Sequence, residues 1–166
     1  MKQVKVAFYK GSGSRVHKII RWWTKSKYSH AELILPDDLT WISISPFLTS
    51  RVARRSVGSV KDLNEWDYLT FPLSWRQPVE EYQLRQLNSF IEKTEGAKYD
   101  WVGMILSQTC PYLIKHKERW YCSEWIAHAL VNCRILMWDD AKIYRTPNLS
   151  PGKLYEILKD HTPSYR

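Results

Sequence analysis

The sequence lacks the features that mark several classes of protein. Only three of its 166 residues are cysteines, at irregular positions, which argues against a disulfide framework. No apolar run approaches the roughly 20 residues that cross a bilayer. Lys2, Lys5 and Lys10 interrupt the N-terminal stretch, so no secretory signal is expected. Reduced thiols without such a signal predict a cytoplasmic protein.

Glycine is also scarce, with six residues, and there is no internal repeat and no linker rich in Pro, Gly or Ser. Aromatic residues are abundant instead. Nine Trp and ten Tyr, within a hydrophobic fraction of 44%, exclude a disordered chain. A chain of this length buries roughly 70% of its unfolded surface without needing a metal or disulfide. We therefore expect one domain over residues 1–166.

Positive charge is in excess, with 25 Lys and Arg against 17 Asp and Glu, a net charge of +8. Such a charge attracts anionic polymers and anionic membrane surfaces. The basic residues look scattered, with one group in 51–61 and another in 115–119. Neither group matches a nucleic-acid recognition motif, so no specific nucleic-acid partner is expected.

Hydrophobic spacing divides the chain into two halves. Period-two alternation predicts strands over 4–8, 29–35, 40–45 and 66–73, while 50–62 looks irregular. Helical spacing predicts a first-half helix after Ser14 and second-half helices over 78–95, 100–109 and 122–133 and from Ser150. Asp100 is the expected N-cap of the 100–109 helix, and Gly96 follows the helix before it. This pattern predicts an α+β domain.

The expected hairpin gathers polar residues on one face. With a turn at Asp37-Asp38, Glu32 pairs with Ser43 and His30 with Ser45, while the other face is apolar. A histidine and a carboxylate backed by a dry face are what an oriented general base requires. The alternative interpretation is the ordinary solvent face of a half-buried sheet.

Cys122 opens a predicted helix directly after an aromatic segment. Unsatisfied N–H groups and the positive dipole end of a helix favour a thiolate and can hold an oxyanion. The alternative interpretation is a buried cysteine acting as a small hydrophobe, which we adopt for Cys110 and Cys133. No spacing of Cys110, His116 and Cys122 matches a structural zinc site, so we expect no metal.

A cysteine nucleophile needs a histidine within hydrogen-bond reach. His128 lies on the same predicted helix and cannot readily pair with Cys122. We expect His17 and His161 at the surface, and His116 in a basic loop is a rival. His30, on a strand beside Glu32, has the better setting.

Three motifs appear in one order: Tyr28-Ser29-His30-Ala31-Glu32-Leu33, then Gly96-Ala97-Lys98-Tyr99-Asp100, then Tyr121-Cys122-Ser123-Glu124. The set resembles the circularly permuted branch of the NlpC-type papain-like cysteine hydrolases. That branch includes YiiX-like amidases and viral and phage relatives, and is distantly related to the lecithin retinol acyltransferase group. The resemblance covers residues 5 to 135. It implies a permuted papain-like fold, in which an antiparallel sheet carrying the histidine packs against helices and one helix carries the cysteine at its N-terminus.

By this resemblance Cys122 is the nucleophile and His30 the general base. Glu32 is the favoured third residue, with Ser43 and Ser45 as alternatives. The implied reaction is acyl transfer to water or to a second nucleophile, without a cofactor. Glu124 is read as an acidic residue in the first turn of a helix, and Asp100 as a cap.

The substrate class stays open among a cell-wall peptide, a lipid amide or ester, and a protein isopeptide or thioester. The Trp22-Trp23 pair and the 120–125 stretch would suit an apolar acyl chain. Two alternative functions remain: a lipid acyltransferase or thioesterase at the same site, and a non-catalytic basic module that binds polyanions. The sequence predicts no oligomeric state. A phage-encoded protein would reach a cell-wall substrate by lysis.

Overall fold

The computed structural model describes residues 2–45, 49–100, 102–104, 119–137 and 149–161. Its centre is a five-stranded sheet in the order β4-β3-β2-β1-β5, in which every neighbouring pair is antiparallel. The strands are β1 (Gln3–Tyr9), β2 (His30–Ile34), β3 (Thr40–Ile44), β4 (Val52–Ser56) and β5 (Trp66–Pro72). Strands β6 (Lys98–Tyr99) and β7 (Arg119–Trp120) form a small parallel pair.

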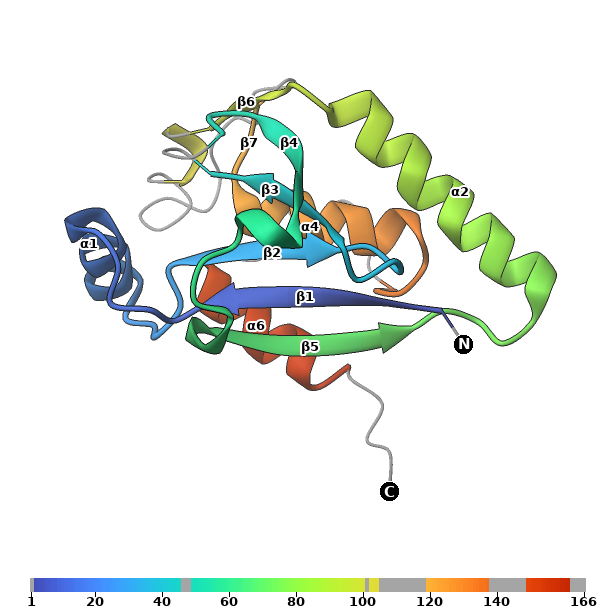
Figure 1. The fold of residues 1–166 in the computed structure, drawn as a ribbon, viewed down its shortest axis with the longest axis horizontal. Helices are drawn as coiled ribbons and strands as arrows, with labels where there is room; N and C mark the ends of the chain where they lie inside the picture. Colours follow the sequence, from blue (N-terminus) through green and yellow to red (C-terminus); the bar gives the residue numbers. More distant parts are fainter. Residues whose placement is uncertain (1, 46–48, 101, 105–118, 138–148, 162–166) are drawn as a thin grey trace.

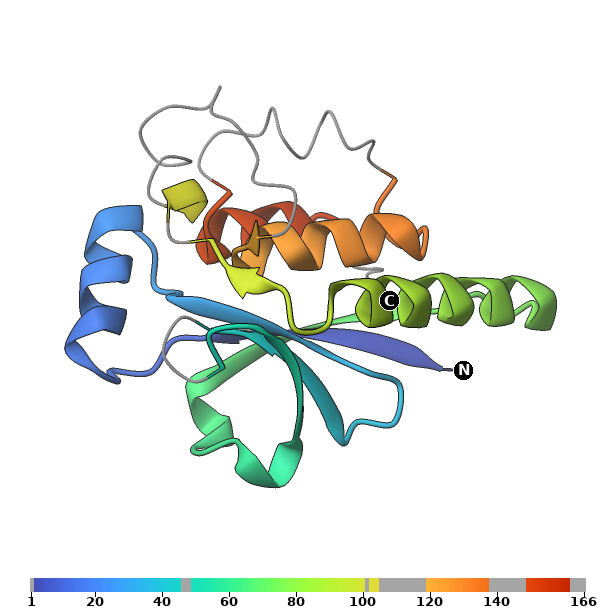
Figure 2. The ribbon, with the colours of Figure 1, turned by 90° about the horizontal axis from the view of Figure 1, so that it is seen from above.

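The helices form a second layer. Helices α2 (Gln77–Thr94), α4 (Cys122–Asn132) and α6 (Pro151–Lys159) cover one face of the sheet, whereas α1 (Arg15–Thr24) stands at one end of the molecule (Figures 1 and 2). The expected α+β class is confirmed. Within the described part of the chain, no helix combines the length and the apolar character needed to cross a membrane.

The main core lies between the sheet and the helices. Val6, Leu33 and Ile42 alternate with residues of the opposite face and are fully buried. They meet Leu130 of α4, and Trp125 of the same helix belongs to this core. Burial of such side chains contributes roughly 1.5–3 kcal/mol each, so the α4 contact holds the helix firmly on the sheet.

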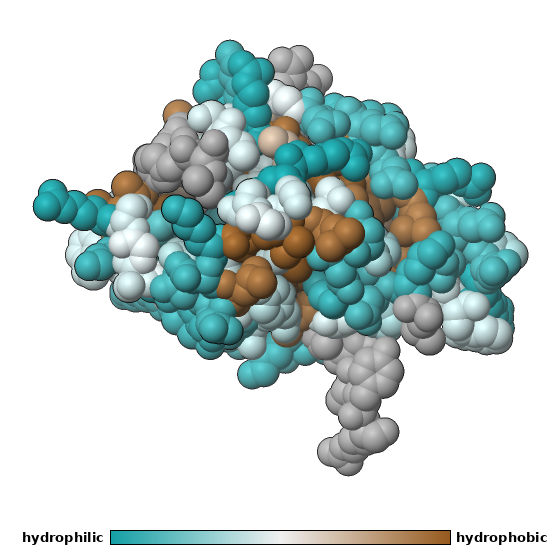
Figure 3. Space-filling view, viewed as in Figure 1, coloured by the Kyte–Doolittle hydropathy of each residue, from teal (hydrophilic) through white to brown (hydrophobic). Residues whose placement is uncertain are grey.

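A smaller cluster occupies the other face of the sheet. Ala7, Ile34, Trp41 and Trp66 pack there, and the turns after β4 help to cover them. On this face hydrophobic residues show between hydrophilic ones (Figure 3). Both faces of the sheet therefore carry buried residues, and polar side chains on this second face can be shielded from water.

The predicted hairpin is confirmed in its register. Leu33 pairs with Ile42 and Ile34 with Trp41, around a turn in which Asp38 adopts a φ of 57°. Aspartate tolerates this left-handed conformation, and the Asp37 carboxylate accepts hydrogen bonds from the Leu39 and Thr40 backbones. The register determines which side chains lie on each face of the sheet, so Glu32 lies on the face opposite the apolar one, as expected.

The prediction that 50–62 is irregular was wrong. Residues 52–56 form β4, which pairs with β3 at the sheet edge. The strand carries Arg54 and Arg55. Charged residues are common on edge strands, where they discourage pairing with other chains. The basic residues of this stretch do not show the hydrophobic alternation that predicts a strand. Val52 of β4 nevertheless packs in the core.

The expected helix boundaries agree closely with the structure. Helix α2 ends at Thr94, and Gly96 follows with a φ of 80°, a conformation that glycine adopts without strain. Asp100 caps the next turn, since its Oδ1 accepts the Gly103 N–H at 2.8 Å. Ser150 caps α6 through Lys153, whereas the Ser14 side chain makes no capping bond to α1. Residues 105–109 of the predicted helix and Cys110 lie outside the described residues.

Candidate active site

Cys122 and His30 begin two elements that start at the same end of the molecule. His30 is the first residue of β2, and Cys122 is the first residue of α4 (Figures 1 and 2). Tyr121 precedes the helix in an extended conformation and its carbonyl accepts the Trp125 N–H, so helical hydrogen bonding starts at this point. The first N–H groups of α4 therefore lie beside the Cys122 thiol.

The His30 ring connects the cysteine to a carboxylate. Its Nε2 lies 3.0 Å from Glu32 Oε1, and its side chain is also hydrogen-bonded to Cys122. Residues i and i+2 on a strand lie about 6.6 Å apart at the backbone, so the Glu32 side chain leans back toward the ring. Because Nε2 faces Glu32, Nδ1 is the ring nitrogen left for Cys122.

The surroundings of His30 favour its charged form. Burial alone lowers the pKa of this histidine. Hydrogen bonds with Cys122 and Glu32, together with their negative charges, outweigh burial and raise the pKa to about 9. His30 is therefore an imidazolium at neutral pH when it faces a thiolate.

Glu32 is a fully buried carboxylate with three partners. In addition to His30, Ser43 Oγ donates to Oε1 at 3.0 Å and Arg55 Nε donates to Oε2 at 2.9 Å. A buried charge is costly unless it is paired and hydrogen-bonded, and here both oxygens are occupied. Of the alternatives for the third position, Glu32 contacts the ring while Ser43 donates to Glu32; Ser45 lies buried just beyond β3.

Arg55 is the site residue that sequence reasoning missed. The sequence places Arg55 in a stretch that looks irregular and basic, whereas in the structure it lies on β4. Its guanidinium is 5.8 Å from the centre of the Trp41 ring. One signal was available. A glutamate on the shielded face of a sheet needs a cation, and Arg54 and Arg55 follow β3 by about ten residues in the sequence.

The prediction that His17 lies at the surface holds only in part. His17 is half-buried, with Nδ1 2.9 Å from Ser29 Oγ and its ring 4.9 Å from the Tyr9 ring. Burial lowers its pKa, and the charge of His30 lowers it further, so this ring is neutral. The cause is tertiary, because α1 folds back against the start of β2.

The other histidines lie elsewhere. His128 is buried on α4 with its ring 5.1 Å from the Trp120 ring. His161 is exposed, as expected, and His116 falls outside the described residues. Of the aromatic residues proposed for an acyl groove, Trp120 and Trp125 belong to the core, whereas Trp22 and Trp23 are exposed.

A small depression opens beside the cysteine. Its wall includes Cys122, Tyr99, and Ile20 and Thr24 of α1. Burial, followed by the charges of Cys122, Tyr121 and Asp100, raises the pKa of Tyr99, so its phenol stays neutral. The depression holds about 20 Å³, which is room for little more than one water-sized group beside the thiol at the N-terminus of α4.

Among the described residues, no three His, Cys, Asp or Glu side chains are grouped so as to hold a metal ion. No protein-family model matches the chain, and no curated protein matches it in sequence. The resemblance to the permuted papain-like hydrolases therefore rests on the three sequence motifs.

Proposed function

We propose that the chain is a cysteine hydrolase that transfers acyl groups through Cys122, His30 and Glu32. The observation that carries the proposal is the continuous contact from a thiol at a helix N-terminus, through an imidazole, to a buried carboxylate. A nucleophile, its base and an orienting group within hydrogen-bond reach are the requirement for covalent catalysis of this kind. The order of histidine strand before cysteine helix, and the antiparallel sheet under helices, support a permuted papain-like fold.

The proposed reaction has two halves. The Cys122 thiolate attacks the carbonyl carbon, an S–C bond forms, and the carbonyl electron pair moves to an oxyanion that the Cys122 backbone N–H stabilises. His30 donates its proton to the leaving nitrogen or oxygen as that bond breaks, which yields a thioester. Water, or a second nucleophile, then attacks the thioester while His30 accepts its proton, and the thiolate leaves.

Glu32 acts in this proposal as a positioning residue for His30. Its charge favours the imidazolium that forms in the first half of the reaction, and its bond to Nε2 keeps Nδ1 directed at the sulfur. Ser43 and Arg55 hold the carboxylate in turn. No step requires a metal or an organic cofactor.

The substrate remains a choice between a peptide amide, a lipid amide or ester, and a thioester. The acyltransferase and thioesterase alternatives use the same three residues and differ only in what resolves the thioester. A non-catalytic polyanion-binding module on the same fold would not require a reactive Cys122, so reactivity separates it from an enzyme.

The first test is the rate of alkylation of Cys122 by iodoacetamide against pH, followed by peptide mass mapping. We expect Cys122 to react well below pH 7, and His30→Ala to slow that reaction by at least about tenfold near pH 6, because the thiolate loses its cation. Cys133 is the internal control, since burial raises its pKa to about 12.

His161→Ala is the matched control variant, because His161 is exposed and lies outside the site. It should leave the alkylation profile of Cys122 unchanged. An inert Cys122 in the wild-type protein, as slow as Cys133, would refute the enzyme. A reactive Cys122 justifies a screen of peptide amides, lipid esters and thioesters with Cys122→Ala as the blank.

A further inference from the structure

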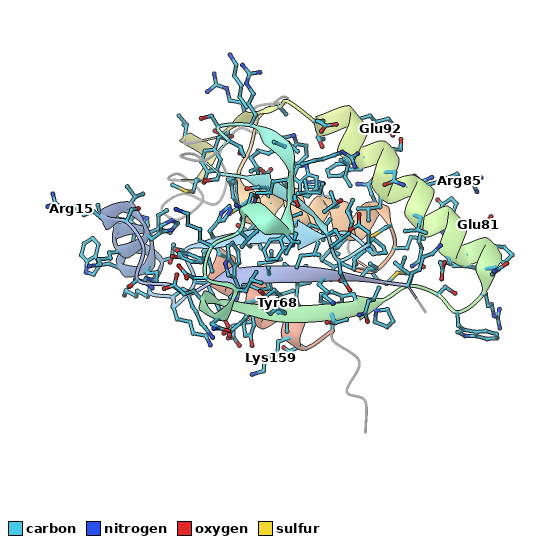
Figure 4. All side chains as sticks on the ribbon, viewed as in Figure 1. Arg15, Tyr68, Glu81, Arg85, Glu92 and Lys159 are labelled. Carbon is cyan, nitrogen blue, oxygen red and sulfur yellow. The ribbon has the colours of Figure 1, made fainter. Side chains whose placement is uncertain are left out.

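Helix α1 presents an unusual outward face. None of its residues is buried, and Ile19, Trp22 and Trp23 are 59%, 76% and 49% exposed. Helical spacing places these residues on one side together with Arg15 and Lys18. The helix stands apart at the end of the molecule, with Arg15 directed away from it (Figures 1, 2 and 4).

The opposite side of α1 is the one that contacts the protein. His17 bonds to Ser29, and Ile20 and Thr24 line the depression at Cys122. The exposed Trp and Ile side chains therefore do not result from a detached helix, because the helix is anchored and presents them outward.

The excess of Lys and Arg over Asp and Glu falls in the N-terminal segment of the sequence. The first 31 residues contain eight Lys and Arg and no Asp or Glu, whereas the rest of the chain carries 17 of each sign. The eight are Lys2, Lys5, Lys10, Arg15, Lys18, Arg21, Lys25 and Lys27. Within that segment, Lys2 and Lys5 lie at the start of β1, away from α1, and pair with Glu80 and Asp38. The basic character that looked scattered therefore belongs, as net charge, to the N-terminal segment that contains α1.

The basic residues around α1 differ in their partners among the described residues. Lys10 and Lys27 pair with Asp67. Within the described ranges, by contrast, no carboxylate pairs with Arg15, Lys18 or Lys25. These charges remain available to an external anion.

We propose that α1 docks the protein onto an anionic lipid surface. Trp side chains favour the headgroup level of a bilayer, Ile the acyl boundary, and Lys and Arg reach lipid phosphates with their apolar stems along the surface. A helix with this distribution lies in the plane of the interface. A nucleic acid would use the charges but would offer no apolar layer for Ile19.

A cleft of about 1100 Å³ extends the docking surface from α1 to α6. Its walls include Trp22, Trp23 and three lysines, Lys25, Lys27 and Lys153, together with one carboxylate, Glu156. The excess of lysine leaves room for anionic headgroups beside the inserted helix. Since the inner side of α1 also lines the depression at Cys122, docking places the lipid surface close to that residue. The docking itself does not depend on any chemistry at Cys122.

The test is flotation of the full chain with lipid vesicles. We expect binding to vesicles of phosphatidylcholine with about 30% phosphatidylglycerol, little binding to pure phosphatidylcholine, and release as salt rises to about 0.5 M. Ile19→Ser with Trp22→Ser should weaken binding by about tenfold or more, because the apolar layer is lost. Arg15→Gln and Lys18→Gln should each weaken it about fivefold.

Two controls locate the effect. Trp75→Ser removes a residue that is 74% exposed just before α2, at the other end of the molecule, and should bind as the wild type does. Cys122→Ala should also bind normally, which separates docking from catalysis. Equal binding to neutral vesicles, or binding that the α1 variants leave unchanged, would overturn the proposal. So would a wild-type dimer that Ile19→Ser with Trp22→Ser converts to a monomer, because α1 would then be a contact between copies.

Discussion

Glu32 is a carboxylate that is costly to bury and that stabilises the charged form of the neighbouring His30 ring. The residue is wholly buried, and His30, Ser43 and Arg55 occupy its two oxygens. Removing any one partner leaves the others with an incompletely paired charge, which is the expensive case for buried ions. The network therefore specifies one orientation of the His30 ring rather than several.

The first prediction at this scale concerns Glu32→Gln. The amide keeps the shape but removes the charge that helps to raise the pKa of His30 to about 9, so burial again pulls this pKa down. A histidine with a raised pKa stays protonated up to that pH, and the variant loses its proton at lower pH. The alkaline limb of kcat/KM for p-nitrophenyl ester hydrolysis should therefore move to lower pH, with activity at about pH 8 reduced by roughly 10²-fold.

Glu80→Gln is the matched control for this experiment. Glu80 lies near the start of α2 and pairs with Lys2, away from His30, and its loss should leave the limb in place. A Glu32→Gln profile that overlays the wild type would show that the carboxylate does not set the protonation of His30.

Among the elements, α6 lies close to the chain that leaves α1, at Gly152. A Cβ placed on Gly152 would lie 2.5 Å from Ser26 Cβ and closer still to Ser26 Oγ. Glycine is required here because the Ser26 side chain occupies the space that a Cβ would take, not because of its φ. The contact helps to set where α1, and with it Trp22 and Trp23, stands relative to the body.

We predict that Gly152→Ala lowers the free energy of unfolding by about 1–3 kcal/mol, since overpacking displaces α6 from the 26–28 segment. Adding Ser26→Gly removes the obstructing atoms and should restore part of that loss, measured by urea denaturation of the four proteins of the cycle. Gly58→Ala, with its nearest atom at 3.8 Å, is the control and should be nearly neutral. Equal losses at Gly58 and Gly152 would argue against a steric cause.

For the whole molecule, the residues of the two halves of the sequence share one core. Strand residues such as Leu33 and helix residues such as Leu130 belong to the same cluster, and Trp125 Nε1 of α4 donates to Thr94 Oγ1 of α2. Neither half buries its apolar face alone. This arrangement favours the single domain that the length of the chain predicts.

The corresponding prediction is a single cooperative unfolding transition. Leu130→Ala should lower the unfolding free energy by about 2–5 kcal/mol, because it leaves a cavity at a fully buried position. Far-ultraviolet and near-ultraviolet circular dichroism should report the same midpoint in both proteins. Two separated transitions, with only one moved by Leu130→Ala, would instead divide the chain into independent units.

Much of the local structure could be predicted from neighbours in the sequence. Period-two alternation around Asp37-Asp38 predicted the register of β2 and β3, and helical spacing after Tyr121 predicted that Cys122 begins a helix. The prediction failed for residues 52–56, where charged side chains interrupt the alternation of hydrophobic residues. Arg54 and Arg55 concealed β4, since their place in the sheet depends on a partner strand.

What the sequence determined by itself is the strands and helices with a clear hydrophobic period and the faces they present, because hydrophobic periodicity acts over a few residues. The tertiary structure alone decided which distant residues meet. Only the folded chain places Arg55 against Glu32 and His17 against Ser29, and leaves Trp22 and Trp23 exposed. The physical reason is that the free energy of burying a polar or charged side chain depends on its partners. Chain folding brings these partners together whatever their separation in the sequence.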